Sequence, residues 1–168
     1  MQNSPISYID FVNDISQHGG EISLVEIEND VTNLDDLSKS LNCKIDDLYK
    51  TVCLNYKIEG VRNLIAVIVP AVAKVDLNKV ENCLENIVGV RVKLKAAQPD
   101  FILSETGFIP GGIPPVGFQC KRFVDTSIFE KNIVYAGGGN NLRAYTAFSP
   151  TVLEQVYPDI LKGDFIVS

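Results

Sequence analysis

The sequence predicts an α+β fold with a mixed, largely antiparallel, barrel-like sheet and surrounding helices. Apolar runs of strand length alternate with short helical patterns, but they do not follow a regular βαβ order. The chain has 168 residues and is 46% hydrophobic, which suffices for one substantial core and is too short for two ordinary domains. We therefore expect a single domain over residues 1–168.

The first quarter of the chain predicts a helix, a strand and a second helix. The first helix is expected to begin at Ser4 and Pro5, because serine caps helices and proline suits their first turn, and to end before Gly19 and Gly20. A strand is expected at 22–27. It is followed by a short helix carrying Leu34, Leu37 and Leu41, with Thr32 or Asn33 as its cap, and by a helical turn at 46–49.

The middle of the chain predicts a hairpin followed by a helix and a basic strand. Residues 51–58 and 63–69 read as two strands joined by a turn at 59–62. Apolar residues at helical spacing predict a helix over 77–85, which returns the chain to a strand at 91–95.

The last part of the chain predicts one more short helix and three strands. The helix is expected at 99–106 and is ended by Gly107, because glycine commonly follows a helix C-terminus. A final helix begins at Ser149 and Pro150. The expected strands between them are 119–125, 132–137 and 142–148.

The segment 107–117 is the most unusual stretch, with four glycines and three prolines in eleven positions. Such a segment is neither helix interior nor central strand, so it forms a shaped loop. Gly111 and Gly112 leave consecutive amides bare of side chains, and the prolines restrict the backbone around them. This arrangement favours a preorganised donor site for an oxyanion, a carbonyl or a phosphate. The alternative is a rigid surface turn without a ligand.

Further residues combine with this loop into an ordered set. They are Lys50 and Thr51 at a strand start, the segment 119–122, Asp125, and a glycine triplet at 137–139 after an apolar strand. Together with the loop, this set resembles the YbaK/prolyl-tRNA synthetase-associated editing-domain family, in its free-standing YbaK type. The resemblance runs in the same order over roughly residues 20–160.

The resemblance implies the fold of that family and a trans-editing hydrolase that deacylates mischarged tRNA. The expected substrate is Cys-tRNA(Pro) or another tRNA(Pro) carrying a small amino acid, and prolyl-tRNA synthetase is a possible partner. Because an aminoacyl ester is already activated, substrate-assisted hydrolysis needs neither a cofactor nor a covalent nucleophile. Two alternatives stay open: a catalytically silent module of the same fold that binds tRNA or a synthetase, and a thiol-dependent hydrolase using Cys53 or Cys120.

The resemblance also implies roles for single residues. Lys50 supplies a cation at the terminal ribose-phosphate region or the reacting centre, with Thr51 beside it in substrate binding. The amides of Gly111 and Gly112 meet the ester carbonyl or oxyanion. Asp125 either orients Lys50 or a water, or caps the turn after it. Gly137 and Gly138 form the opposite wall of the substrate site.

The charge distribution limits where RNA can bind. Residues 1–49 carry two lysines against ten acidic side chains, and residues 50–168 carry thirteen basic against eleven acidic ones, so their net charges are −8 and +2. Such a protein is a poor nonspecific nucleic-acid binder, and no DNA partner is expected. The candidate tRNA contacts are Lys121 and Arg122 after the glycine loop, and the three cations of 91–95, which also suit a solvated strand face.

Other chemistries lack their residues. The only histidine is His18, which argues against a serine or cysteine triad, and the scattered thiols Cys43, Cys53, Cys83 and Cys120 argue against a metal site. The glycine triplet does not match G-x-G-x-x-G, and no Walker lysine follows either loop. No apolar run reaches the length of a membrane helix and no secretory signal is visible, so we expect a cytoplasmic protein with reduced thiols.

Overall fold

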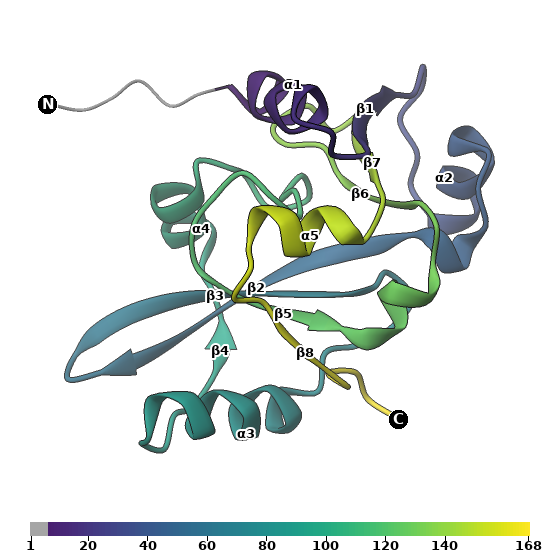
Figure 1. Cartoon of the computed structure of the whole chain (residues 1–168). Coiled ribbons are helices and arrows are strands. Elements are labelled where there is room, and N and C mark those ends of the chain that lie inside the picture. Colours follow the sequence, from purple (N-terminus) through teal and green to yellow (C-terminus); the bar gives the residue numbers. More distant parts are fainter. Residues whose placement is uncertain (1–6) are drawn as a thin grey trace, which may run out of the picture.

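The computed structural model describes residues 7–168 and contains two sheets (Figure 1). The larger sheet has the order β4-β2-β3-β5-β8, and the smaller has the order β1-β7-β6. The strands are β1 (Ile22–Glu26), β2 (Tyr49–Ile58), β3 (Val61–Pro70), β4 (Lys95–Ala96), β5 (Lys121–Asp125), β6 (Val134–Gly137), β7 (Ala144–Phe148) and β8 (Leu161–Gly163).

Five helices and two short 3-10 turns accompany the sheets within residues 7–168. Figure 1 shows α3 on one side of the larger sheet and α5 on the other. The helices are α1 (Tyr8–Gln17), α2 (Leu34–Leu41), α3 (Leu77–Val88), α4 (Pro99–Thr106) and α5 (Thr151–Val156), and the turns are η1 (Ile45–Asp47) and η2 (Thr126–Glu130). None of the helices in this part of the chain has the length and apolar character needed to cross a membrane.

The pairing confirms an α+β fold with mixed, mostly antiparallel strands. β3 pairs with β5 and β5 pairs with β8 in parallel, whereas the other four strand pairs are antiparallel. The expectation of a barrel-like sheet is wrong. The larger sheet ends at β4 and β8, the smaller ends at β1 and β6, and a barrel would require the end strands of a sheet to pair with each other.

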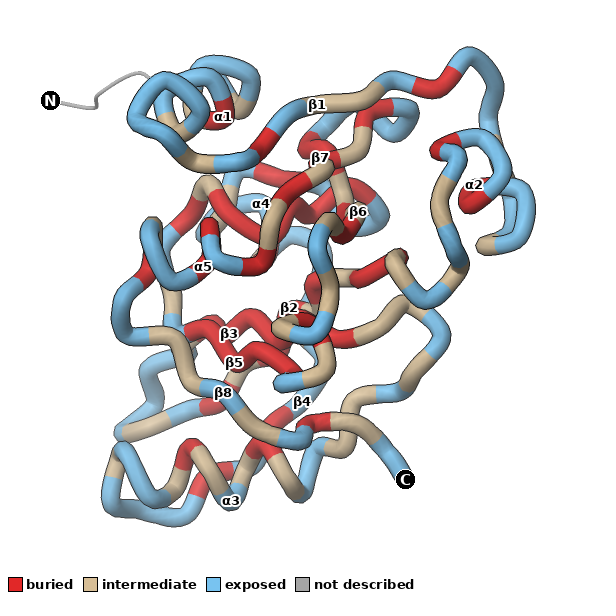
Figure 2. Tube along the Cα trace, turned by 45° about the vertical axis from the view of Figure 1, so that its right-hand side comes forward, coloured by how far each residue is buried: buried red, intermediate tan, exposed pale blue. Residues whose placement is uncertain are grey.

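The core lies on both faces of the larger sheet. Buried residues follow β3 and β5 through the middle of the molecule (Figure 2), and residues 65–69 of β3 are fully buried. Val67 packs with Val80 and Leu84 of α3, whereas Ile68 packs with Val152 of α5 on the other face. A strand that is covered on both faces reads as an unbroken apolar run, which is what the sequence shows here.

Most predicted elements are confirmed with small shifts at their ends. α1 begins at Tyr8, and the Ser7 hydroxyl accepts a hydrogen bond from the Asp10 amide. The expected cap at Ser4 and Pro5 lies outside the described residues. The hairpin between β2 and β3 turns at Glu59 and Gly60, which both have positive φ.

The predicted basic strand at 91–95 is wrong, because only Lys95–Ala96 pairs with β2. The amides of Val92 and Leu94 instead donate to the carboxylates of Glu85 and Glu81 on α3, at 2.9 and 3.0 Å. Side chains still alternate between buried and exposed, but helix carboxylates take the place of a neighbouring strand.

Candidate active site

A cavity of about 370 Å³ opens where the two sheets meet. An isolated bridge between Leu48 and Tyr135 joins the start of β2 to β6 at this place. The walls come from α2, the start of β2, the loop at residues 107–117 (the glycine-proline loop), β6 and β7. The lining residues are Leu34, Leu37, Leu48, Tyr49, Lys50, Thr51, Ala71, Gly111, Ile113, Tyr135, Ala136, Gly137 and Tyr145.

Lys50 brings a cation to this cavity of mainly apolar walls. It is the second residue of β2, where it pairs with Val69 of the buried strand β3. Among residues 7–168, its Nζ makes neither a hydrogen bond nor an ion pair, and partial burial lowers the pKa of its ammonium group. An ammonium group without a partner at a cavity wall is available to an anionic or carbonyl group of a ligand.

Thr51, the next residue of β2, lines the same cavity. Its side chain is 9% exposed, and its Oγ1 is buried without a hydrogen-bond partner among the described residues. Buried hydroxyls nearly always have a partner, so a ligand or bound water that reached this oxygen would supply the missing hydrogen bond. The predicted pair of Lys50 and Thr51 is therefore brought together with the cavity.

The two glycine loops form one unit at the other wall. The Gly139 amide donates to the Gly112 carbonyl at 2.8 Å. A Cβ on Gly112 would overlap the Gly139 carbonyl oxygen, and a Cβ on Gly137 would overlap the Ile113 carbonyl oxygen. These glycines are needed because the backbones of the loops touch.

The four predicted glycines therefore differ in their access to the cavity. Gly111 and Gly137 line the cavity, whereas Gly112 and Gly138 are buried behind it. The Gly112 amide donates to the Ile109 carbonyl within its own turn, at 3.3 Å. That use of the amide contradicts its expected role as a donor to an ester carbonyl, and Gly138 is a packing residue whose Cβ would overlap the Ala144 carbonyl.

Asn140 is a residue of this site that the sequence reasoning missed. Its side-chain amide accepts from the Ile109 amide at 2.9 Å and donates to the Gly107 carbonyl at 3.0 Å, so it ties the glycine triplet to the start of the proline-containing loop. The available signal was its position directly after the triplet, because asparagine side chains often bond to loop backbones. The cavity aromatics Tyr135 and Tyr145 were also missed.

Asp125 caps a turn and does not line the cavity. It is 3% exposed, and its carboxylate accepts from the Ser127 amide and hydroxyl and from the Phe165 amide, at 3.3, 2.6 and 3.0 Å. The prediction that Asp125 contacts substrate or orients Lys50 is therefore wrong, and the capping alternative is correct. The Ser127 hydroxyl also bonds to the hydroxyl of Tyr49, which lines the cavity, at 2.9 Å. Asp125 therefore supports Tyr49 indirectly, through Ser127.

The predicted tRNA contact at Arg122 is also contradicted. Its side chain is 2% exposed, donates to the carbonyls of Pro115 and Phe118, and lies over the rings of Phe118 and Tyr157. A covered guanidinium cannot reach a phosphate on the surface. Lys121 is exposed but lines a separate groove with Arg62.

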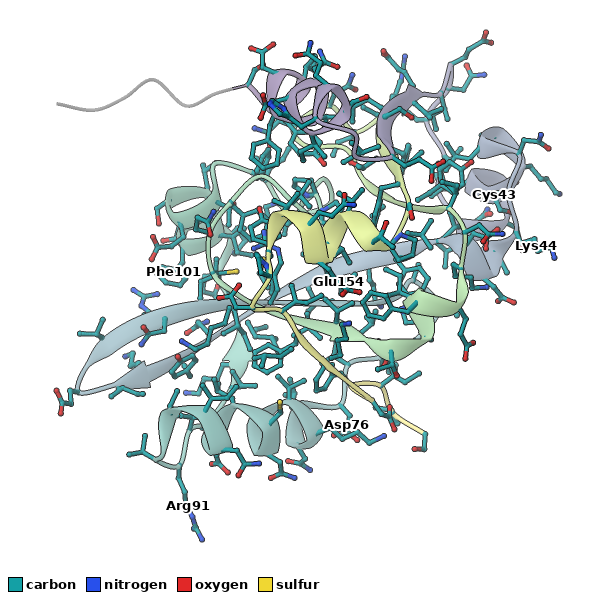
Figure 3. All side chains as sticks on the ribbon, viewed as in Figure 1. Cys43, Lys44, Asp76, Arg91, Phe101 and Glu154 are labelled. Atoms are coloured by element: carbon teal, nitrogen blue, oxygen red, sulfur yellow. The ribbon has the colours of Figure 1, made fainter. Side chains whose placement is uncertain are left out.

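The cations predicted around Arg91 lie far from the cavity. Figure 3 shows Arg91 projecting beyond the end of α3, whereas Lys44 lies beside α2. Lys44 also lines a second, polar hollow of about 660 Å³, which shares Tyr135 with the candidate cavity. Lys131 lines this second hollow as well and forms an ion pair with Asp47 at 3.6 Å.

The thiols and the histidine lie outside the cavity lining. Burial raises the pKa of the Cys53 thiol to about 12 and also raises that of Cys120, so both are poor nucleophiles near neutral pH. His18 is exposed at the end of α1 and contacts Asp14. Within residues 7–168, no group of three or more His, Cys, Asp or Glu side chains is arranged to hold a metal ion.

Solved structures share this architecture. The chain superposes on the hypothetical protein APE2540 with a TM-score of 0.74 and 21% identity, covering 96% of this chain and 100% of that one. A candidate trans-editing enzyme for prolyl-tRNA synthetase gives 0.73 and 22%, covering 98% and 100%. A candidate signal transduction protein from Marinobacter aquaeolei gives 0.62 and 14%, covering 97% of this chain but 31% of that one. The fold is therefore shared with the first two of these proteins over their full lengths, and it also occurs within a larger chain.

The family follows from the sequence match. Residues 28–148 match the family model of the aminoacyl-tRNA editing domain. The chain belongs to this family, which confirms the resemblance drawn from Lys50, Thr51 and the two glycine loops. The match ends before α5 and begins after β1, so both termini lie outside the matched segment.

Proposed function

We propose that this protein deacylates mischarged tRNA in trans, with tRNA(Pro) carrying cysteine or another small amino acid as the leading substrate. The observation that carries the proposal is the cavity in which Lys50 and Thr51, both without partners among the described residues, face a wall containing Gly111 and Gly137. Its volume suits a small aminoacyl group with part of the terminal ribose.

The chemistry can run on positioning and electrostatics. The ester carbonyl would lie near the Gly111 amide, to which the described residues present no acceptor, and the Lys50 ammonium would stabilise negative charge on the oxyanion or the adjacent phosphate. Water would attack the carbonyl, and the neighbouring ribose hydroxyl would relay a proton from this water to the ester oxygen, which leaves as the free ribose hydroxyl while the amino acid departs as its carboxylic acid. Thr51 would hold the substrate by accepting or donating one hydrogen bond.

A tRNA- or synthetase-binding module without catalysis is the second candidate. The same fold occurs within a longer candidate signal transduction protein, and a fold does not fix a function. The two candidates differ in turnover, since a binding module would protect the ester.

The decisive experiment is a panel of tRNA(Pro) charged with Cys, Ala, Ser or Pro, incubated with the protein in the presence and absence of prolyl-tRNA synthetase. We expect loss of at least one small amino acid and retention of proline. Binding without ester loss on every substrate would overturn the enzymatic proposal in favour of the module.

Lys50→Ala tests the assigned cation. Loss of about 3 kcal/mol of transition-state stabilisation would lower deacylation roughly a hundredfold. The matched control is Lys57→Ala, on the exposed end of the same strand.

The pH dependence of the reaction tests the same cation. Because burial lowers the pKa of Lys50, the wild-type rate should fall as pH rises through a value below the pKa of an exposed lysine. Wild-type turnover by Lys50→Ala would exclude Lys50 from the reaction.

A further inference from the structure

A chain of hydrogen bonds connects α1 to the cavity wall. The Thr146 hydroxyl donates to the Gly137 carbonyl at 2.7 Å, and the Tyr8 hydroxyl lies 2.7 Å from the same Thr146 oxygen. Since Thr146 has one hydroxyl proton and gives it to Gly137, Tyr8 must be the donor in the other bond. The side chain of Thr146 is fully buried, so no solvent replaces either partner.

The ring of Tyr8 also touches both glycine loops. A Cβ on Gly117 would lie 3.0 Å from the ring, and one on Gly139 would lie 3.3 Å from it. Phe108, at the start of the glycine-proline loop, packs edge-on against Tyr8 with ring centroids 5.6 Å apart. A single side chain of α1 is thus wedged between the loops that form one wall of the cavity.

Gly137 is the point where this support reaches the cavity. It lines the cavity, and its Cα lies so close to the Ile113 carbonyl that a Cβ would not fit. A movement of the Gly137 peptide would therefore displace Ile113, which lines the cavity as well. Tyr8 precedes the segment that matches the editing-domain family, so neither the family match nor the site assigned above includes it.

We propose that Tyr8 is a positioning residue that acts through Thr146 to hold the Gly137 peptide and the docked glycine loops in the geometry that the reaction requires. The inference rests on the proposed deacylase function, and α1 is then part of the framework of the site. By fixing the direction of the Thr146 hydroxyl, Tyr8 keeps the Gly137 carbonyl hydrogen-bonded, and its ring packs against Gly117 and Gly139 of the two loops.

The test compares variants that change the chain of bonds with variants that only destabilise. Tyr8→Phe removes one hydroxyl, Thr146→Val removes both bonds, and Thr146→Ser keeps them. Ile9→Ala changes the exposed face of α1, and Val80→Ala destabilises the distant core under α3. Each is measured well below its melting temperature, for kcat and KM on the preferred mischarged tRNA.

We expect kcat to fall roughly threefold to tenfold in Tyr8→Phe, and more in Thr146→Val, with little change in KM, because the loss of a buried hydrogen bond is of that size. Thr146→Ser should restore most of the rate. Ile9→Ala and Val80→Ala should retain it. Equal rates in all variants would overturn the proposal. So would a loss of rate in Val80→Ala as large as that in Tyr8→Phe at a similar decrease in melting temperature, because the rate would then depend on stability alone.

A second measurement does not depend on catalysis. The Gly139 amide donates to Gly112, so its hydrogen exchange reports directly on the docking of the two loops. Exchange should accelerate in Tyr8→Phe and Thr146→Val and not in Val80→Ala. If the wild type deacylates no substrate but exchange responds in this way, the deacylase function fails while the structural link stands. Unchanged exchange in both hydroxyl variants would overturn the link itself.

Discussion

Arg122 is predicted to stabilise the fold and to make no contribution to tRNA binding. Its Nε donates to the Pro115 carbonyl at 3.0 Å and its Nη2 to the Phe118 carbonyl at 2.6 Å. The guanidinium carbon lies 3.6 Å from the centroid of the Tyr157 ring. Pro115 lies in the glycine-proline loop and Phe118 directly after it, so Arg122 of β5 holds the end of this loop against the strand.

The magnitude follows from what Arg122→Ala would remove. Two hydrogen bonds from a charged donor contribute about 1.5–3 kcal/mol each, and a desolvated cation over an aromatic ring about 2 kcal/mol. Burial of the guanidinium charge itself costs free energy, as the lowered pKa of Arg122 indicates. The alanine variant avoids this cost, so the net loss of stability is smaller than the sum of the lost interactions. We expect a net decrease in the free energy of unfolding of about 3–5 kcal/mol.

Urea unfolding and salt-dependent tRNA binding test the two roles separately. Lys121→Ala is the matched control, because its neighbouring side chain is exposed and should change stability by less than about 0.5 kcal/mol. If Lys121 contacts a phosphate, its removal lowers the salt slope by up to about one unit. Arg122→Met should leave the slope of the folded protein unchanged. Wild-type stability together with a reduced slope in Arg122→Met would refute this reasoning.

Two further predictions concern the loops and the thiols. Gly112→Val should abolish deacylation and also lower the melting temperature strongly, because any Cβ at this position overlaps the backbone of Gly139. The neighbouring Ile113→Val should lower the free energy of unfolding by only about 0.5–1.5 kcal/mol. Native stability and activity in Gly112→Val would refute the docking of the two loops. Cys53 should resist alkylation in the folded protein at pH 8. Because burial raises its pKa to about 12, stability should fall as pH rises from about 9, where the unfolded thiol ionises and the folded one does not, and Cys53→Ala should show a shallower fall.

The order of elements could be predicted from the sequence because it depends on local patterns. The apolar run in β3, the caps of the helices and the glycine that ends α4 each act over a few residues. The separation into two open sheets could not be predicted, because it depends on which distant strands pair. The parallel pairing of β5 with β3 brings together segments that are more than fifty residues apart.

The same distinction applies to the site. The resemblance to the editing-domain family implied roles for Lys50, Thr51, Gly111 and Gly137, and all four residues line the cavity. Arg122 was misread because a basic residue beside an exposed lysine resembles a surface patch, and only the rings of Phe118 and Tyr157 reveal its burial. Asn140 bonds to the backbone at Ile109 and Gly107, which are 31 and 33 residues earlier; its position after the glycine triplet suggests a loop contact but does not indicate which loop it reaches.

The polar groups at the start of β2 oppose folding, and this is an independent reason to regard them as functional. Lys50 is partly desolvated without a counter-ion, and Thr51 buries a hydroxyl without a partner within residues 7–168. Because burial lowers the pKa of Lys50, the unfolded state binds more protons between the two pKa values, and stability rises with pH through that window. Apolar side chains at both positions would fold at lower cost. We propose that a ligand entering the cavity supplies the interactions that Lys50 and Thr51 lack.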